Sequence, residues 1–168
     1  MHLAGIGNAG KISEVLYRGA QPKDTGLAEL KKLGITTIVD LRADNQEKAE
    51  WERLESERLG LRFVRIPVDG WSPPTDEQVA QFLTLFREEP RQKILVHCRF
   101  GDDRTGVFVA AYRMAVNKWT AEQAMGEMYF FGFNGFWHPS MKEYVRKFPG
   151  RLHSSPALAA LFAKPGAP

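Results

Sequence analysis

Cysteine is nearly absent from this sequence, which has a single one, Cys98, among 168 residues. One cysteine excludes an internal disulfide bond, and with only four scattered histidines it also excludes a thiolate-rich zinc site. We therefore expect chemistry that uses no metal and no other cofactor.

The sequence also lacks an apolar run long enough to span a membrane. Its first ten residues have neither the charged start nor the apolar centre of a signal peptide. We expect a cytoplasmic protein with no integral membrane segment. The alternative is an exported protein whose targeting segment is not part of this sequence.

A block of charge of one sign is missing as well. The 23 lysines and arginines are interleaved with 20 acidic residues, for a net charge of +3, and this pattern argues against nucleic acid as the main partner. With 43% hydrophobic residues, the chain can bury the core of one soluble domain. We expect a single domain over residues 1–168 and a monomer, with a surface arm at 1–13 and a weakly structured tail at 151–168.

Apolar β-prone runs alternate with helical patterns along the chain. The expected strands cover residues 14–18, 35–41, 61–67 and 94–97, and the expected helices cover about 24–33, 44–60, 75–86, 105–116, 120–129 and 139–148. Thr75 and Thr120 open capping boxes, Asp44 begins a similar pattern, and Asp24 can cap the first helix. This alternation predicts an α/β fold with a central, mostly parallel sheet and helices on both faces.

The most informative stretch is KILVHCRFGDDRTG, residues 93–106. It indicates a buried strand, a glycine-containing loop and the start of a helix. The loop N–H groups and the first free N–H groups of the helix converge on one point, where the helix dipole adds positive charge. This arrangement predicts an anion site beside Cys98.

Cys98 opens this loop and Arg104 closes it, so a thiol and a guanidinium can face the same anion. The nearby N–H dipoles and the positive charge favour the thiolate. Attack on a phosphate monoester requires a nucleophile, here the thiolate, and a bidentate donor such as a guanidinium to hold the phosphate oxygens. The alternative interpretation is an inert buried thiol with an ordinary surface arginine.

The order His97, Cys98, five residues, Arg104 and Thr105 resembles the signature of the cysteine-dependent protein tyrosine and dual-specificity phosphatases. The ending Asp-Arg-Thr-Gly is similar to that of bacterial dual-specificity-like phosphatases and of lipid-active relatives. The segment YRGAQP, residues 17–22, resembles the opening of the same group, and we assign it no catalytic role.

This resemblance implies a dual-specificity phosphatase-like fold and a phosphocysteine intermediate on Cys98. It implies that Arg104 binds phosphate and stabilises the transition state, that Thr105 assists departure of the thiolate, and that His97 tunes the thiol. The phosphate-binding residues that it implies are Arg99, Phe100, Gly101, Asp102, Asp103 and Arg104.

The leaving group also needs a proton, which a carboxylic acid usually supplies. In the resembled family the acid is an aspartate on a loop that follows a strand, and Asp69 has that place in this sequence. Asp103 is the rival because it lies in the loop itself, although it can instead orient Arg104 or a neighbouring loop. Asp76 is a weaker candidate, since a carboxylate at a helix start stabilises the helix dipole.

The substrate class stays open between several possibilities. We expect a phosphorylated protein or a small phosphomonoester, because Asp102 and Asp103 disfavour a second substrate phosphate; Arg99 has the opposite effect. Phosphoinositides or inositol polyphosphates are the alternative substrates. A phosphate-binding module without catalysis is the alternative from another class, and a redox protein has no second cysteine in this sequence to resolve a disulfide. The aromatic run 129–137 is either a pocket wall or core packing.

Overall fold

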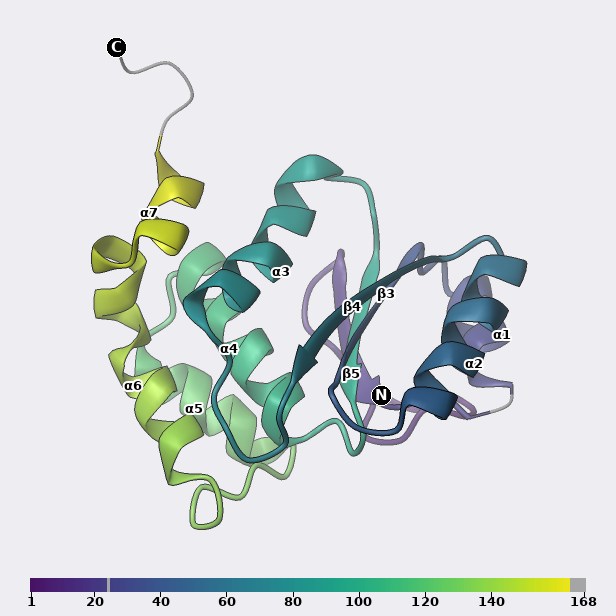
Figure 1. Cartoon of the computed structure of the whole chain (residues 1–168), viewed down its shortest axis with the longest axis horizontal. Helices are drawn as coiled ribbons and strands as arrows, with labels where there is room; N and C mark the ends of the chain where they lie inside the picture. Colours follow the sequence, from purple (N-terminus) through teal and green to yellow (C-terminus); the bar gives the residue numbers. More distant parts are fainter. Residues whose placement is uncertain (24, 164–168) are drawn as a thin grey trace.

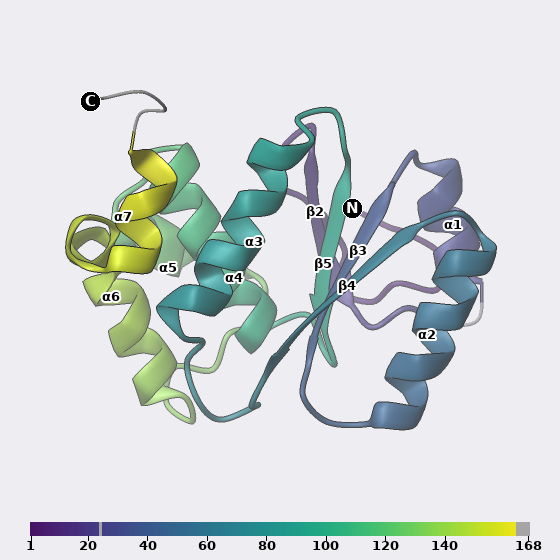
Figure 2. The ribbon, with the colours of Figure 1, turned by 45° about the horizontal axis from the view of Figure 1, so that its top comes forward.

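The computed structural model describes residues 1–23 and 25–163. Within these residues, one sheet contains the strands β1 (Gly10–Lys11), β2 (Leu16–Ala20), β3 (Thr37–Arg42), β4 (Arg62–Val68) and β5 (Ile94–Cys98). The strand order is β1-β2-β5-β3-β4, and only the short β1 runs antiparallel to its neighbour. Figures 1 and 2 show β5 near the middle of the sheet.

Helices cover both faces of this sheet. They are α1 (Gly26–Lys32), α2 (Gln46–Arg58), α3 (Asp76–Glu88), α4 (Asp103–Val116), α5 (Ala121–Phe130), α6 (Pro139–Ser154) and α7 (Pro156–Phe162). Figures 1 and 2 show α1 and α2 on one side and α3 to α7 on the other. The predicted α/β architecture, with a mostly parallel central sheet between helices, is confirmed.

Alternate residues of β5 enter different cores because successive strand side chains point to opposite faces. Ile94, Val96 and Cys98 belong to the large core under α3 to α7, whereas Leu95 belongs to the smaller core under α1. All five residues of β5 are buried, as expected for an internal parallel strand. The same alternation directs His97 toward α2, where it contacts Glu52.

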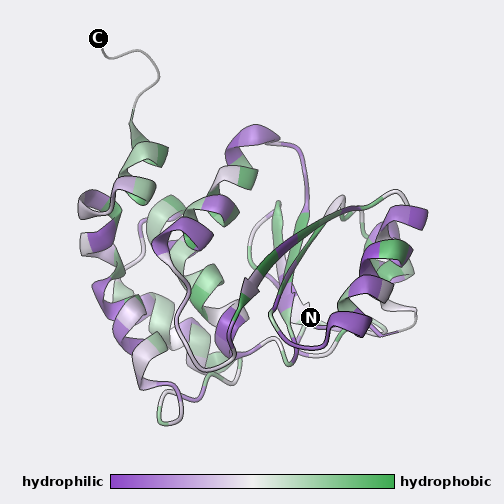
Figure 3. Ribbon diagram, in the orientation of Figure 1, coloured by the Kyte–Doolittle hydropathy of each residue, from purple (hydrophilic) through white to green (hydrophobic). Residues whose placement is uncertain are grey.

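Helix α2 is mostly polar, and Figure 3 shows it largely in the hydrophilic colour. Arg53 pairs with Glu50 and Glu57 along its exposed face, at the three- and four-residue spacings that place side chains side by side on a helix. Its buried residues include Glu52. The helix therefore brings a carboxylate to the interior instead of an apolar stripe.

The capping signals were predicted with mixed success. Thr75 and Thr120 form the expected capping boxes at α3 and α5. At α2, however, the N-cap is Asn45, whose side chain accepts from the N–H of Lys48, and not Asp44. Asp44 is instead bound to an arginine, as described below. The proposed cap Asp24 lies outside the described residues.

The C-terminal segment differs from the weakly structured tail expected at 151–168. Helix α6 continues through Pro149 to Ser154, and α7 follows over Pro156–Phe162; residues 164–168 lie outside the described residues. A proline within a helix costs about 3 kcal/mol, but here Phe148 and Leu158 are completely buried and Arg151 contacts Asp76 of α3. Tertiary packing therefore outweighs the helix-breaking signal.

The arm at residues 1–13 is tied to the sheet through β1 and buries Ile6, Ala9 and Ile12. Within the part of the chain that the structure describes, no helix combines the length and apolar character that crossing a bilayer requires.

Candidate active site

The anion loop, residues 99–102, joins β5 to α4 at the carboxyl edge of the sheet. Cys98 ends β5, where it pairs with Ala20 of β2, and is only 2% exposed. The loop borders a cleft of about 450 Å³. Of the residues predicted from the sequence, those lining the cleft are Cys98, Asp69, Arg99, Phe100, Asp102, Asp103 and Arg104; the other lining residues are Asp44, Gly70, Trp71 and His138.

The carbonyl groups of the anion loop are held by donors from the first part of the chain. The C=O of Arg99 accepts from the N–H of Gln21 at 3.3 Å. Nδ2 of Asn8 donates to the C=O of Phe100 at 3.4 Å and to that of Gly101 at 3.0 Å. In a trans peptide the N–H points opposite to the C=O, so these contacts turn the following N–H groups toward the cleft. Successive N–H groups arranged in this way form an anion-binding nest.

Gly101 has no substitute at its position. Its φ of +74° is in the left-handed region, and a Cβ there would lie 2.5 Å from the backbone N of Ala20. The close approach lets the loop lie directly on β2. Gly101 does not line the cleft; it contributes the turn that aims its neighbours.

Arg18 of β2 lies completely buried beneath the anion loop. Its Nη2 donates to the C=O of Gly101 at 2.6 Å, and its guanidinium lies 4.0 Å from the ring centre of Phe131. Burial lowers the pKa of Arg18 to about 10, while the negative charges of Glu127 and Cys98 oppose that fall. Arg18 thus stays protonated at neutral pH and places a cation under the loop that carries Cys98.

Arg104, in the first turn of α4, is 7% exposed. Its Nη1 donates to Oδ1 of Asp44 at 2.8 Å and to the C=O of Val68 at 3.1 Å. The Arg104 contact holds the pKa of Asp44 below its usual value. The guanidinium is therefore fixed at the cleft wall between the loops that follow β3 and β4.

His97 belongs to a buried network on the other side of the sheet. Its Nε2 lies 2.7 Å from Oε1 of Glu52, and Arg42 contacts both Glu52, at 2.6 Å, and Asp40, at 2.8 Å. Burial alone would lower the pKa of His97, but the charge of Glu52 and the hydrogen bond to it outweigh burial and leave the pKa raised. Nδ1 of His97 lies 3.1 Å from the C=O of Cys98. The raised pKa favours the imidazolium form, and a positive charge beside this peptide stabilises a thiolate.

Asp69 lies in an exposed loop, residues 69–74, which we call the Asp69 loop. Its Oδ1 accepts from the N–H groups of Trp71 at 2.8 Å and Ser72 at 3.1 Å. These hydrogen bonds, with a smaller effect from Arg104, lower the pKa of Asp69. In this arrangement the carboxyl group is ionised at neutral pH, the form that accepts a proton.

Asp103 faces the loop that precedes α6. Its Oδ1 accepts from the N–H of Asn134 at 3.1 Å, and its Oδ2 lies 3.0 Å from Nε2 of His138. Burial and the neighbouring charge of Asp102 raise the pKa of Asp103, although the Asn134 hydrogen bond opposes them. These contacts match the alternative in which Asp103 orients a neighbouring loop.

The third candidate, Asp76, binds structural partners. It accepts from the hydroxyl of Tyr144 at 2.8 Å and contacts Arg151 at 3.2 Å. These contacts link the start of α3 to α6.

His138 was missed by the sequence analysis although it lines the cleft. It is 7% exposed and stacks on Trp71 with ring centres 5.1 Å apart. The stack joins the start of α6 to the Asp69 loop. Because Trp71 and His138 are distant in the sequence, their contact becomes visible only in the folded structure. The nearby run 129–137 is divided: Phe133 is core, while Phe136 and Trp137 are exposed.

A family model described as "DSP-PTPase phosphatase fused to NAD+ Kinase" matches residues 7–143. The dual specificity protein phosphatase TpbA of Pseudomonas aeruginosa is 30% identical over 126 residues, which cover 75% of this chain and 55% of TpbA. The putative tyrosine-protein phosphatase OCA1 of Mycosarcoma maydis is 27% identical over 122 residues, which cover 71% of this chain and 77% of OCA1. The chain thus spans about half the length of TpbA.

The fold agrees with these similarities. A crystal structure of P. aeruginosa TpbA matches with a TM-score of 0.73 at 27% identity, covering 92% of this chain and 91% of that one. A TpbA variant in complex with pTyr matches with a TM-score of 0.74 at 26% identity, covering 94% of this chain and 91% of that one.

Proposed function

The chain belongs to this family of DSP-PTPase phosphatases, and we propose that it hydrolyses phosphomonoesters through a phosphocysteine formed on Cys98. One observation carries the proposal. The carbonyls of the anion loop are held away from the cleft by Asn8, Arg18 and Gln21, so the loop N–H groups are directed toward the cleft that Cys98 and Arg104 both line. Such a preorganised cradle stabilises the charge of a phosphoryl group during transfer.

The reaction has two steps. In the first, the Cys98 thiolate attacks phosphorus, the bond to the leaving oxygen breaks, and that oxygen takes a proton from an acid. In the second, water attacks the phosphocysteine, the S–P bond breaks, and the thiolate and inorganic phosphate are released. Arg104 and the loop N–H groups bind the equatorial oxygens in both steps.

We assign the acid to Asp69 and departure of the thiolate to Thr105. Asp69 lines the cleft beside Arg104 and is free of partners beyond its own loop among the described residues. Its ionised form suits the second step, in which it takes a proton from water. Thr105 is completely buried, and its hydroxyl has no hydrogen-bond partner within the described residues, which leaves the hydroxyl able to donate to the sulfur.

We propose protein phosphotyrosine as the substrate class. The exposed rings of Trp71 and Phe100 border the cleft and can flank a phenyl group. The carboxylates of Asp44, Asp102 and Asp103 at the same cleft disfavour a substrate with clustered phosphates. A variant of TpbA, a relative with a similar fold, has been crystallised with pTyr.

We further propose that the chain acts as one phosphatase domain, as a cytoplasmic monomer that uses no cofactor and does not bind nucleic acid. A thiolate nucleophile persists best where thiols are kept reduced, and the basic residues are interleaved with acidic ones along the sequence. Size-exclusion chromatography tests the oligomeric state.

The activity is tested by phosphate release from a small aryl phosphate with a chelator present. We expect turnover that resists the chelator and is abolished in Cys98→Ser, because serine at this position is a far weaker nucleophile. Folded wild type without turnover on aryl phosphate, phosphotyrosine peptide and inositol phosphates would favour a binding module instead.

A further inference from the structure

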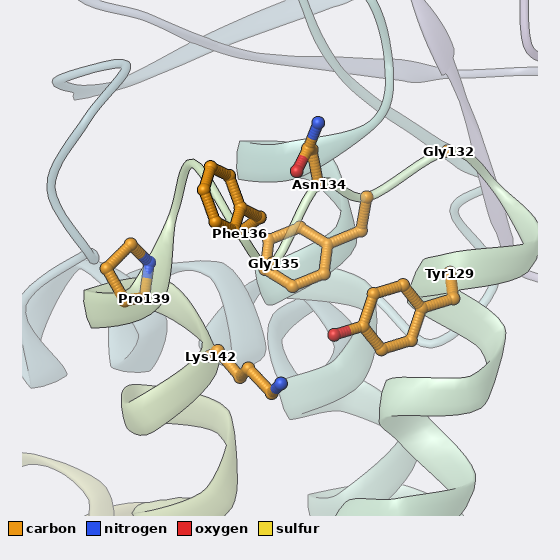
Figure 4. Close-up of a pocket in the computed structure, with 8 residues that line it drawn as sticks. Tyr129, Gly132, Asn134, Gly135, Phe136, Pro139 and Lys142 are labelled. Atoms are coloured by element: carbon orange, nitrogen blue, oxygen red, sulfur yellow. The ribbon is translucent and has the colours of Figure 1, made fainter.

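A second hollow, of about 700 Å³, lies beside the cleft and has no place in the reaction proposed above. It opens between residues 131–138 and the first turn of α6, and Figure 4 shows its lining. The side chains that matter are Tyr129, Asn134, Phe136 and Lys142. We call it the aromatic hollow.

The aromatic hollow and the catalytic cleft share a wall. The N–H of Asn134, which lines the hollow, donates to Oδ1 of Asp103, which lines the cleft. His138 borders the cleft and the next residue, Pro139, borders the hollow. The hollow therefore lies next to the cleft, where a residue that flanks a phosphorylated side chain in the cleft could reach it.

The walls of the hollow are apolar side chains that the fold leaves exposed. Phe136 is 83% exposed and Tyr129 is 46% exposed, whereas the nearby Phe133 is buried in the core. Figure 4 shows the Tyr129 hydroxyl and the Lys142 ammonium pointing toward one another. The floor thus combines one cation and one hydrogen-bond donor between aromatic rings.

Lys142 has an unmatched positive charge. Two other cations of α6 contact carboxylates, Lys147 with Glu143 and Arg151 with Asp76. Lys142 is half-buried and contacts no carboxylate within the described residues. The catalytic cleft next to it, in contrast, has Asp102 and Asp103 at its rim. A ligand that is neutral at the rim and negative at Lys142 is complementary to this surface.

We propose that the aromatic hollow binds an acidic side chain that flanks the phosphotyrosine of a protein substrate. The proposal rests on the function given above and names the sequence context that the site prefers. The carboxylate of the flanking residue accepts from Lys142 and Tyr129 while its methylene groups pack on Phe136. The hollow thus adds affinity for a protein substrate that an isolated aryl phosphate does not gain.

The test measures binding of phosphotyrosine peptides to a Cys98→Ser background, so that it needs no turnover. One glutamate is moved through successive positions on either side of the phosphotyrosine, and each peptide is compared with its lysine counterpart. We expect one or two positions at which glutamate binds about fivefold more tightly than lysine. Lys142→Glu should reverse this ratio and Lys142→Met should bring it near one.

Lys147→Glu, which makes the same charge change on an exposed part of the same helix, should leave the ratio as it is in the parent. Equal affinities at every position, or a glutamate preference that survives Lys142→Glu, would overturn the proposal. Because the readout is a ratio of binding constants, these results are separate from the hydrolysis assay, whose failure would count against the catalytic function alone.

Discussion

The anion loop and the Asp69 loop face each other across one cleft but are fixed in opposite ways. Each anion-loop carbonyl from Arg99 to Gly101 has a donor from residues 8–21. Asp69 contacts only its own loop, through Trp71 and Ser72, among the described residues. The difference follows from the chemistry: a charge-stabilising cradle has to be preorganised, whereas an acid that donates and then accepts a proton benefits from a loop that can move.

The two loops also differ in charge. Beneath the anion loop lie the buried cation of Arg18 and His97 with its raised pKa, both of which stabilise a thiolate. The Asp69 loop has a carboxyl group with a lowered pKa, so it is anionic before substrate arrives. A bound phosphate would oppose that charge and favour the protonated acid.

Among changes within the two loops, the largest effect is expected from Gly101→Ala, which disturbs the anion loop. The added Cβ would clash with the backbone of Gly19 and Ala20, and the φ of +74° is unfavourable for alanine. The loop therefore has to move, and its N–H groups no longer point into the cleft. We expect kcat/KM for an aryl phosphate to fall about 1,000-fold, the scale of losing preorganised donors. Gly126→Ala is the matched control, because a Cβ there meets nothing within 4 Å and kcat/KM should stay as in wild type. Retained activity in Gly101→Ala would show that the loop does not need its present conformation.

The next effect tests the Asp69 loop. Asp69→Asn removes the proposed acid, and we expect kcat/KM to fall about 100-fold. Because the pKa of Asp69 is lowered, its protonated fraction decreases as pH rises above that pKa, so wild-type kcat/KM should decline on the alkaline side of that acidic pKa. This decline should disappear in Asp69→Asn.

The rival carboxylate provides the contrast to that result. Asp103 has a raised pKa but contacts Asn134 and His138, so Asp103→Asn should change KM more than the pH profile. The Asp69→Asn loss should also be larger for phosphotyrosine than for an aryl phosphate with a more acidic leaving group, which needs less help from a proton donor. A lost alkaline decline in Asp103→Asn, and not in Asp69→Asn, would assign the acid to Asp103.

The sequence predicted the part of the site that is local. The strand, the loop and the helix start lie within residues 93–106, so the spacing of Cys98 and Arg104 alone indicates that they share an anion. The alternating strands and helices likewise predicted the sheet, because each element has its own period. The local sequence pattern was therefore sufficient to predict the elements and the loop whose structure depends mainly on neighbouring residues.

The remaining parts depend on contacts between distant segments. Asn8 and Arg18 reach the loop from 93 and 83 residues away. No pattern near Asn8 indicates its contact, and the YRGAQP segment that contains Arg18 resembles the family without indicating what Arg18 binds. Asp44 has the sequence pattern of a helix cap, but Arg104 binds it and Asn45 caps the helix instead. His138 precedes the first turn of α6, and nothing in the sequence around it indicates a place at the cleft. In each case tertiary contacts decide between several local uses of a polar side chain.

The smallest effect is expected from removing the side chain of Asn8, which holds the anion loop from the N-terminal arm. Asn8 has a φ of +50°, so Asn8→Gly removes the side chain without straining the backbone. Gly101 keeps its hydrogen bond to Arg18, while the carbonyls of Phe100 and Phe131 lose theirs. At about 1 kcal/mol for a hydrogen bond, kcat/KM should fall about fivefold.

Lys118→Gly is the control for that variant, because it has a φ of +60° and a side chain that donates to the C=O of Ala115 at the far end of α4. Both variants should lose similar thermal stability, measured as Tm, but only Asn8→Gly should lose activity. An equal loss of kcat/KM in both would mean that activity follows general stability. A loss confined to Asn8→Gly would mean that the N-terminal arm is part of the apparatus that aims the anion loop, and that rigidity of this loop extends to a segment whose sequence gives no sign of it.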